Sequence, residues 1–350
     1  MGRLILRLVR HRFTDGGSFS EGAPHFVFFV SASCNSRTRL RRLVELGRIP
    51  YSERRVLIDL PETSTAARIR YMDCETLIAD LSVVRNRLRV TGADRVEFLH
   101  GQCTNDIRRL RAGENCCAAF LNAKGKMRGE GQVICLDNSF LLEVNPALAP
   151  SLEEFIITED VTIEDVSTAL GEWLVVGDGS GEVPAQTVTF RHPLGWVVIS
   201  KVPMTATIGE ETLEVLRIEA AVPKWGVDMD ENTIPNEAGL ETRAISYDKG
   251  CYIGQETIAR IKTYGHVNRR LVQIAIEPQA PKAFGVPPIP ARGDKLLVDG
   301  REVGQVTSAV RSSRLGKPLA LGYVRREFAT AGAKLNWNNE MAEVLRVCGE

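Results

Sequence analysis

Long hydrophobic runs are missing from this 350-residue sequence. Stretches such as Phe26 to Val30 and Cys116 to Leu121 are far shorter than the roughly 20 apolar residues that a membrane-spanning helix requires. The formal net charge at pH 7 is zero, so no overall field draws the protein toward nucleic acid or a membrane surface. Residues 72–350 also carry no basic stripe interleaved with aromatic side chains. We therefore expect a soluble protein with no membrane partner and no direct nucleic-acid partner.

Histidine is scarce and the cysteines are scattered, which argues against a preformed metal site. The chain has five histidines and eight cysteines, and no two cysteines form a C-x-x-C pair. In a chain of this size, that pattern favours reduced thiols in a reducing compartment over a disulfide framework. It predicts neither a zinc site nor another all-protein metal cage. The adjacent Cys116 and Cys117 lie in an apolar stretch and are interpreted as structural.

Lysine is absent from the first 71 residues, which contain thirteen arginines and six acidic residues. The acid-free, arginine-rich stretch Met1 to Thr14 resembles a mitochondrial presequence, although Pro24 and nearby glycines interrupt the pattern. A plainer interpretation is that translation begins at Met72. We expect residues 1–71 to be disordered or an over-extended start outside the fold. The expected location is cytoplasmic, and the alternative is the mitochondrial matrix.

The most informative segment is the octapeptide Lys249 to Glu256, K-G-C-Y-I-G-Q-E. A cysteine beside a lysine and close to a helix N-terminus is favoured in its reactive thiolate form by the cation and by the helix dipole. Cys251 is placed in this way if a helix begins near Gly254. The apolar spacing of the next residues predicts a helix over Gln255–Lys262, and Gly265 ends it.

The same residues have a purely structural interpretation. Gly250 and Gly254 would supply unusual backbone angles at a turn. Cys251 would then be a small buried apolar group, because free cysteine is among the most buried residue types. Spacing alone does not separate this interpretation from a functional thiol, so both stay open at this point.

The octapeptide resembles the signature K-G-C-Y-x-G-Q-E of the YgfZ family. These are folate-binding proteins of iron–sulfur cluster maintenance, related to the aminomethyltransferase, or T-protein, of the glycine cleavage system. Other segments resemble the conserved blocks of that family in the same order: Val90–Asp94, Phe98–Asp106, Leu121–Lys126, Arg217–Pro223, Trp225–Asp228, Ile234–Leu240, Arg269–Val272 and Gly300–Ser308. The resemblance spans about residues 74 to 346.

The sequence pattern predicts an α+β protein. Short apolar runs bounded by turn residues, such as Cys116–Leu121, are typical of hairpin strands. The resemblance implies a T-protein-like fold, with two intertwined folate-binding subdomains over residues 72–270 and a small C-terminal β-barrel over residues 271–350. The proline-rich stretch Pro278 to Pro290 is interpreted as the connection that marks this boundary.

The resemblance also implies a cofactor and a residue that holds it. In the T-protein, folate occupies a central cavity and a glutamate of the R-x-E-A block holds the pterin ring. The matching residue is Glu219. A carboxylate suits this role because it accepts two parallel hydrogen bonds from the amino group and ring N–H of a pterin. The ligand would be tetrahydrofolate or a one-carbon derivative, and an exposed helix acid is the structural alternative.

The sequence departs from the T-protein pattern where an aspartate assists methylene transfer. The corresponding stretch is Arg128 to Gln132, in which Glu130 is the one acid. Cys251 stands where T-proteins have no cysteine. These differences imply that folate binding is retained, that aminomethyl transfer is lost and that a thiol function is added.

Cys251 is interpreted as the functional thiol of the motif. It could ligate iron or a transient iron–sulfur cluster, for which a single cysteine needs ligands from a partner, or act as an oxidisable thiol beside reduced folate. Lys249 would favour the thiolate, and Tyr252 would pack against the wall of the folate cavity. Gln255 and Glu256 would order the loop.

The expected function is that of a folate-binding accessory protein in iron–sulfur cluster assembly or repair, without independent catalytic activity. Its partners would be folate, iron–sulfur assembly proteins and client iron–sulfur enzymes, including those that thiolate tRNA. The alternative is a folate-dependent aminomethyltransferase of the glycine cleavage type, with Glu130 in place of the missing aspartate.

Overall fold

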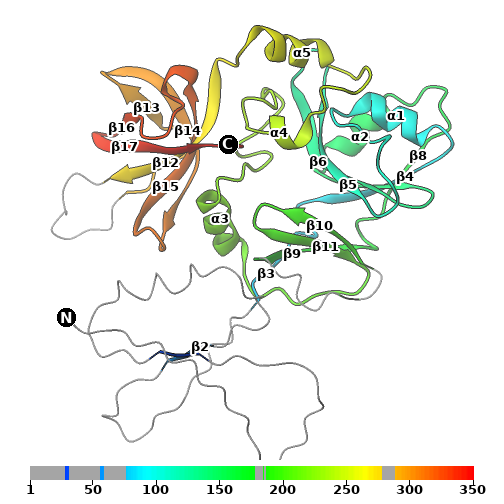
Figure 1. The fold of residues 1–350 in the computed structure, drawn as a ribbon, viewed down its shortest axis with the longest axis horizontal. Coiled ribbons are helices and arrows are strands. Elements are labelled where there is room, and N and C mark those ends of the chain that lie inside the picture. The colour runs from blue at the N-terminus through cyan, green and yellow to red at the C-terminus, as the bar shows by residue number, and fades with distance from the viewer. Residues whose placement is uncertain (1–27, 31–55, 59–75, 178–183, 185–186, 278–287) are drawn as a thin grey trace, which may run out of the picture. The chain divides into compact units, whose positions relative to one another are not determined.

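The computed structural model describes residues 28–30, 56–58, 76–177, 184, 187–277 and 288–350 (Figure 1). The chain divides into two compact units, Met1–Thr76 and Leu77–Glu350. In the first unit, β1 (Phe28–Val30) and β2 (Val56–Ile58) pair in parallel. The rest of residues 1–71 lies outside the described residues. The expectation that this segment is disordered or outside the fold therefore stays a prediction. The predicted domain boundaries stay predictions.

A five-stranded antiparallel sheet, in the order β5-β6-β7-β4-β8, forms one layer of the second unit. Its strands are β4 (Asn86–Thr91), β5 (Asn115–Leu121), β6 (Met127–Cys135), β7 (Phe140–Val144) and β8 (Thr162–Asp165). Helices α1 (Arg95–Gln102) and α2 (Leu148–Glu153) supply Leu99 and Leu148 to a core with Leu88 and Phe120 of the sheet. The predicted hairpin-rich pattern is confirmed for this layer.

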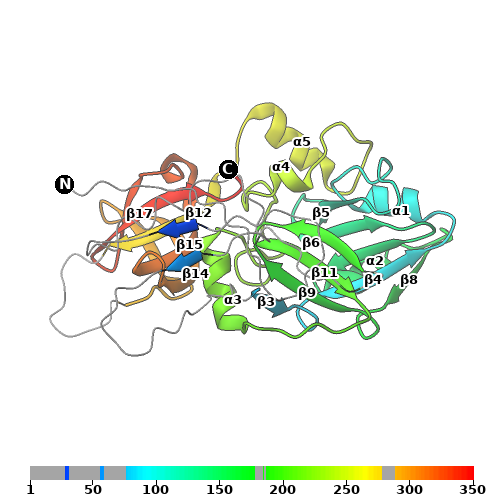
Figure 2. The ribbon, with the colours of Figure 1, turned by 60° about the horizontal axis from the view of Figure 1, so that its bottom comes forward.

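A four-stranded antiparallel sheet, in the order β10-β11-β9-β3, lies against the first sheet (Figure 2). Its strands are β3 (Ile78–Asp80), β9 (Gly171–Val176), β10 (Val188–His192) and β11 (Gly195–Ser200). Ile134 and Leu141 of the first sheet share one apolar cluster with Leu174 and Val197 of the second. No helix in the described parts of the chain is long and apolar enough to cross a membrane.

The C-terminal strands close into an antiparallel barrel, in the order β12-β15-β14-β13-β16-β17. They are β12 (Arg269–Glu277), β13 (Lys295–Val298), β14 (Arg301–Ser312), β15 (Lys317–Arg325), β16 (Lys334–Trp337) and β17 (Glu340–Val347), with the short 3₁₀ helix η3 (Arg326–Phe328) after β15. Val272, Val306 and Val344 contribute to its apolar interior. The predicted barrel is therefore confirmed.

The proline-rich stretch does not connect two domains, so that interpretation is wrong. β12 (Arg269–Glu277) precedes it and β13 (Lys295–Val298) follows it, and both are barrel strands. The stretch is therefore a connection within the barrel, although residues 278–287 lie outside the described residues. The chain enters the barrel directly after helix α5 (Gln255–Tyr264) and a short loop.

Helix α3 (Glu210–Glu219) lies between the barrel and the second sheet (Figures 1 and 2). On the sheet side, Leu213 packs against the apolar cluster that contains Phe190 and Val197. On the barrel side, Ile218 packs with Leu319. The helix is therefore fixed on both faces by apolar contacts.

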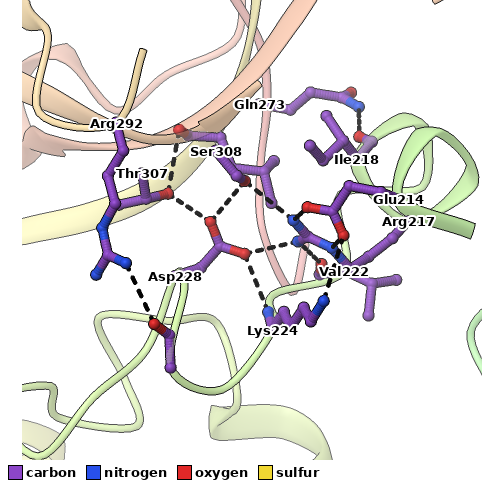
Figure 3. A network of polar contacts seen from close by, with 12 residues as sticks. Glu214, Arg217, Ile218, Val222, Lys224, Asp228, Gln273, Arg292, Thr307 and Ser308 are labelled. Atoms are coloured by element: carbon purple, nitrogen blue, oxygen red, sulfur yellow. Dashed lines mark hydrogen bonds and ion pairs between the residues drawn. The ribbon is translucent and has the colours of Figure 1, made fainter. Parts of the chain in front are cut away.

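A buried polar network joins α3 to the barrel (Figure 3). Arg217 donates through Nη1 to Oδ2 of Asp228 at 2.6 Å, and the backbone N–H of Lys224 donates to the same oxygen at 3.0 Å. The hydroxyls of Thr307 and Ser308 on β14 both donate to Oδ1 of Asp228. Asp228 is 2% exposed, and both of its oxygens have donors. A buried carboxylate is tolerated here because it is paired and hydrogen-bonded.

We expect Asp228→Ala to lower the free energy of unfolding by about 1–3 kcal/mol, because Arg217 and Ser308 lose the buried acceptor that they share, although Glu214 still pairs with Arg217. Glu302→Ala is the matched control in the barrel, since Glu302 pairs with Lys295 at the surface. That control is expected to cost less than about 1 kcal/mol. Denaturant unfolding followed by circular dichroism measures both values. Equal losses in the two variants would contradict a special role for the network.

Candidate functional site

The motif loop, residues 249–254, is anchored through Lys249 to the segment Phe98–Asp106. The ammonium of Lys249 donates to the backbone carbonyls of His100 at 2.6 Å, Cys103 at 2.6 Å and Asn105 at 2.9 Å. Its three protons are thus all bound, and the side chain is buried. Burial lowers the pKa of Lys249. No described contact joins Lys249 to Cys251, so its observed role is to hold the loop.

Gly254 anchors the other end of the motif loop. Its φ is +81°, and a Cβ there would lie 2.5 Å from the carbonyl oxygen of Asn122. Only glycine permits both this left-handed conformation and this close approach. Helix α5 (Gln255–Tyr264) begins at the next residue, and Gly265 follows it with φ +118°. The predicted helix and its end are confirmed.

Tyr252 is buried beneath the motif loop. Its ring lies in an apolar cluster with Leu121, Met127 and Ile258, and the Lys249 Nζ is 5.0 Å from its centroid. Burial raises the pKa of the Tyr252 hydroxyl to about 12. The side chain therefore ties the loop to β5, β6 and α5. Contact of Tyr252 with a folate cavity stays a prediction.

Cys251 is the exposed one among the six cysteines in the described part of the chain. The interpretation of Cys251 as a small buried group is therefore wrong. Burial raises the pKa of the other five, Cys103, Cys116, Cys117, Cys135 and Cys348. No group of three or more His, Cys, Asp or Glu side chains in the described residues could hold a metal ion. Iron bound at Cys251 would need ligands from a partner.

Gln255 and Glu256, the last two residues of the motif, make different contacts. Glu256 pairs with Arg260 one turn along α5, at 2.7 Å, and both side chains are largely exposed. This pair supports the helix rather than the loop. The backbone N–H of Gln255 donates to the carbonyl of Tyr252 at 3.2 Å and closes the turn before the helix. An ordering role of the Gln255 side chain stays a prediction.

Glu219 lies away from the motif loop, at the end of α3 facing the barrel. Its carboxylate accepts hydrogen bonds from the hydroxyl of Ser312 and, at 3.0 Å, from Nε of Arg314. Its backbone carbonyl accepts from Gln273 and Arg346. A pterin that used both carboxylate oxygens would therefore have to displace the Ser312 and Arg314 donors. The pterin role of Glu219 stays a prediction.

Glu130 lies in a buried cluster of charged side chains. The sequence pattern pointed to Glu130 but to no other member of this cluster. Arg85 pairs with Glu130 at 2.8 Å and also with Glu143 on β7. Burial acts to raise the pKa of Glu130, but the charges of Arg85 and Arg243 outweigh it and lower the pKa. One signal was present in the sequence, because Glu143 is a charged residue within the otherwise apolar strand Phe140–Val144.

The barrel and the whole fold have known counterparts. Residues 269–344 match the family described as the glycine cleavage T-protein C-terminal barrel domain. The crystal structure of glycine cleavage system aminomethyltransferase T from Bartonella henselae is similar, with a TM-score of 0.63 and 18% identity, over 77% of this chain and 84% of that chain. These similarities define the class: the protein has the glycine cleavage T-protein fold.

Sequence relatives narrow the class. The tRNA-modifying protein YgfZ of Yersinia pseudotuberculosis is 28% identical over 264 residues, which are 63% of this chain and 77% of that protein. An aminomethyltransferase of a Nostoc species is 38% identical over 122 residues, but these are only 35% of this chain and 30% of the enzyme. The sequence relatives of this chain thus include a YgfZ protein as well as aminomethyltransferases.

The depressed pKa of Glu130 predicts a pH-dependent contribution to stability. Its ionised form stabilises the folded state above the unfolded-state pKa of about 4.3, and this contribution is lost as the pH falls through the folded-state pKa. We expect Glu130→Gln to lower the free energy of unfolding at pH 7 by about 1–3 kcal/mol, and this difference to shrink below about pH 4.3.

Urea denaturation of wild type and Glu130→Gln at neutral and acidic pH tests this dependence. Glu164→Gln is the matched control, because Glu164 forms an ion pair with Arg89 in which both side chains are exposed. The control is expected to differ little from wild type at either pH. A stability difference for Glu130→Gln that stayed constant with pH would contradict the depressed pKa.

Proposed function

We propose that this protein binds folate in the cytoplasm and supports the assembly or repair of iron–sulfur enzymes, including those that thiolate tRNA. The observation that carries the proposal is the exposure of Cys251 on a loop fixed at both ends by Lys249 and Gly254. A thiol that served packing would be buried, whereas this thiol is exposed and open to the proposed partner. Thiolate is the preferred soft ligand for iron and iron–sulfur clusters.

The folate component of the proposal is supported by the fold and by the R-x-E-A block. The T-protein fold is shared with an aminomethyltransferase of the glycine cleavage system. Tetrahydrofolate or a one-carbon derivative is the proposed ligand, and Glu219 the proposed pterin-binding residue. Iron–sulfur assembly proteins and their client enzymes are the proposed partners, and a cluster would be a transient cargo.

The aminomethyltransferase alternative is less well supported. Its acid–base residue would be Glu130, the acid nearest to the missing aspartate in sequence. The carboxylate of Glu130 is bound by Arg85, and the neighbouring positive charges lower its pKa. A carboxylate held in this way is a weak base, because its ionised form is stabilised. The thiol of Cys251 is the more available reactive group.

We expect Glu219→Gln to weaken tetrahydrofolate binding by about tenfold to a hundredfold, because a charge-assisted hydrogen bond contributes about 1.5–3 kcal/mol. Isothermal titration calorimetry measures this affinity. Arg314→Gln is the matched control, since it removes the charge partner of Glu219 and leaves the carboxylate in place. Unaltered affinity in Glu219→Gln would contradict the pterin-binding role.

We expect Cys251→Ala and Cys251→Ser to abolish complementation of a strain that lacks the accessory function. Both variants should keep the wild-type affinity for tetrahydrofolate, because the thiol is proposed to act in ligation or redox chemistry. A serine hydroxyl cannot replace it, since its far higher pKa makes it a poor ligand. Cys135→Ser is the control at a half-buried cysteine. Full complementation by Cys251→Ala would contradict the proposed function.

A further inference from the structure

A polar pocket of about 320 Å³ lies between the barrel and the loop 227–233. Its barrel wall is formed by strands β12, β14 and β15 together with Arg292, which lies shortly before β13. Neither Glu219 nor Cys251 lines this pocket. Its volume is at the lower end of the range that small-molecule sites have, so the pocket has room for a small ligand.

The hydroxyl of Tyr323 on β15 is a buried polar group in the pocket wall. Tyr323 is 8% exposed, and its hydroxyl has no hydrogen-bond partner in the described residues. Burial raises the pKa of Tyr323, while the nearby hydroxyl of Thr233 acts to lower it. Thr233 donates its own proton to Oδ1 of Asp230 at 3.1 Å. Native structures leave few buried polar groups unpaired, and this hydroxyl offers a donor and an acceptor to a ligand.

Two of the four charged side chains in the pocket wall are already neutralised by the protein. The carboxylate of Asp228 pairs with Arg217 at 2.6 Å. Arg269 pairs with Glu237 at 3.1 Å, and its guanidinium lies 4.6 Å from the centroid of the Tyr323 ring. These contacts fix the wall of the pocket, and they leave neither group as a free charge for a ligand.

The other two charged side chains, Arg292 and Asp230, form no ion pair in the parts of the chain that the structure describes. Arg292 reaches from the barrel to the carbonyl of Gly226, to which its Nη1 donates at 3.3 Å (Figure 3). Its other N–H groups remain available. Oδ1 of Asp230 accepts from the backbone N–H of Asn232 at 2.8 Å. A wall with one unpaired cation and one unpaired anion suits a ligand that carries both charges.

We propose that this pocket binds a free α-amino acid with a short polar side chain. The α-carboxylate pairs with Arg292, because a planar guanidinium matches a carboxylate through two parallel hydrogen bonds. The α-ammonium pairs with the carboxylate of Asp230. The polar end of the ligand side chain bonds to the hydroxyl of Tyr323, and Val306 packs against its methylene groups.

Isothermal titration calorimetry of the full chain with L-glutamine tests this proposal. Glutamine carries both α-charges and a side-chain amide that donates and accepts hydrogen bonds. We expect a dissociation constant of about 1 mM or lower. N-Acetylglutamine lacks the ammonium and glutaminamide lacks the carboxylate, so each is expected to bind at least about tenfold more weakly.

Arg292→Gln is expected to weaken glutamine binding by about tenfold to a hundredfold, because the α-carboxylate loses its charged donor. Arg301→Gln is the matched control, since Arg301 is an exposed arginine of the barrel outside the pocket wall. That variant is expected to keep the wild-type affinity.

Tyr323→Phe separates a ligand-binding hydroxyl from a structural one. Glutamine binding is expected to weaken by about threefold to tenfold, and alanine, whose side chain has no polar end, is expected to bind as in wild type. Without ligand, the variant should be at least as stable in urea as wild type, since the hydroxyl that it loses has no partner in the described residues. A less stable variant would overturn the assignment of this hydroxyl to a ligand.

Three results would overturn the proposal as a whole. The first is no glutamine binding to wild type at up to about 10 mM, which requires no variant and so does not depend on the folding of one. The second is equal binding of glutamine and its two analogues, and the third is wild-type affinity in folded Arg292→Gln. The assay uses neither folate nor iron, so the proposed function stands or falls separately.

Discussion

The carboxylate of Asp228 is the contact on which the arrangement of α3 and the barrel depends. It accepts hydrogen bonds from Arg217 on the helix and from Thr307 and Ser308 on β14. Each of these groups would be costly to bury alone, so the helix and the barrel are stable together in one arrangement. That arrangement also brings the donors of Ser312 and Arg314 to Glu219, and it therefore sets the surroundings of the candidate pterin residue.

Lys249 is a second buried charged residue that holds two distant parts of the chain together, in this case at the motif loop. Lys249 binds three backbone carbonyls of the segment His100–Asn105, which lies about 145 residues earlier in the chain. The lysine holds the loop, and its neighbour Cys251 remains exposed. The same anchoring brings His100 to the edge of the motif. The sequence indicates an electrostatic role for Lys249, whereas the contacts of its ammonium show that it holds the loop in place.

The charged cluster at Glu130 supports the proposal that this T-protein fold does not carry out aminomethyl transfer. Arg85 and Arg243 keep the Glu130 carboxylate ionised, while Arg85 also binds Glu143. Such pairing stabilises the folded state and removes the free base that group transfer requires. In the proposed function, the reactive group is the exposed thiol of the motif loop. The fold is thus shared with the aminomethyltransferase, and the proposed function differs because the reactive side chains differ.

The sequence by itself determined the local elements and the family motifs. Helix α5 and its flanking glycines Gly254 and Gly265 were predicted because capping and apolar spacing depend on neighbouring residues. The barrel was predicted from the resemblance of its blocks. Tertiary structure alone decided that Lys249 binds distant carbonyls, that Arg85 pairs with Glu130 and that His100 faces Gly250. These contacts join residues that are far apart in sequence, and the direction of a buried polar side chain depends on partners that only folding brings near.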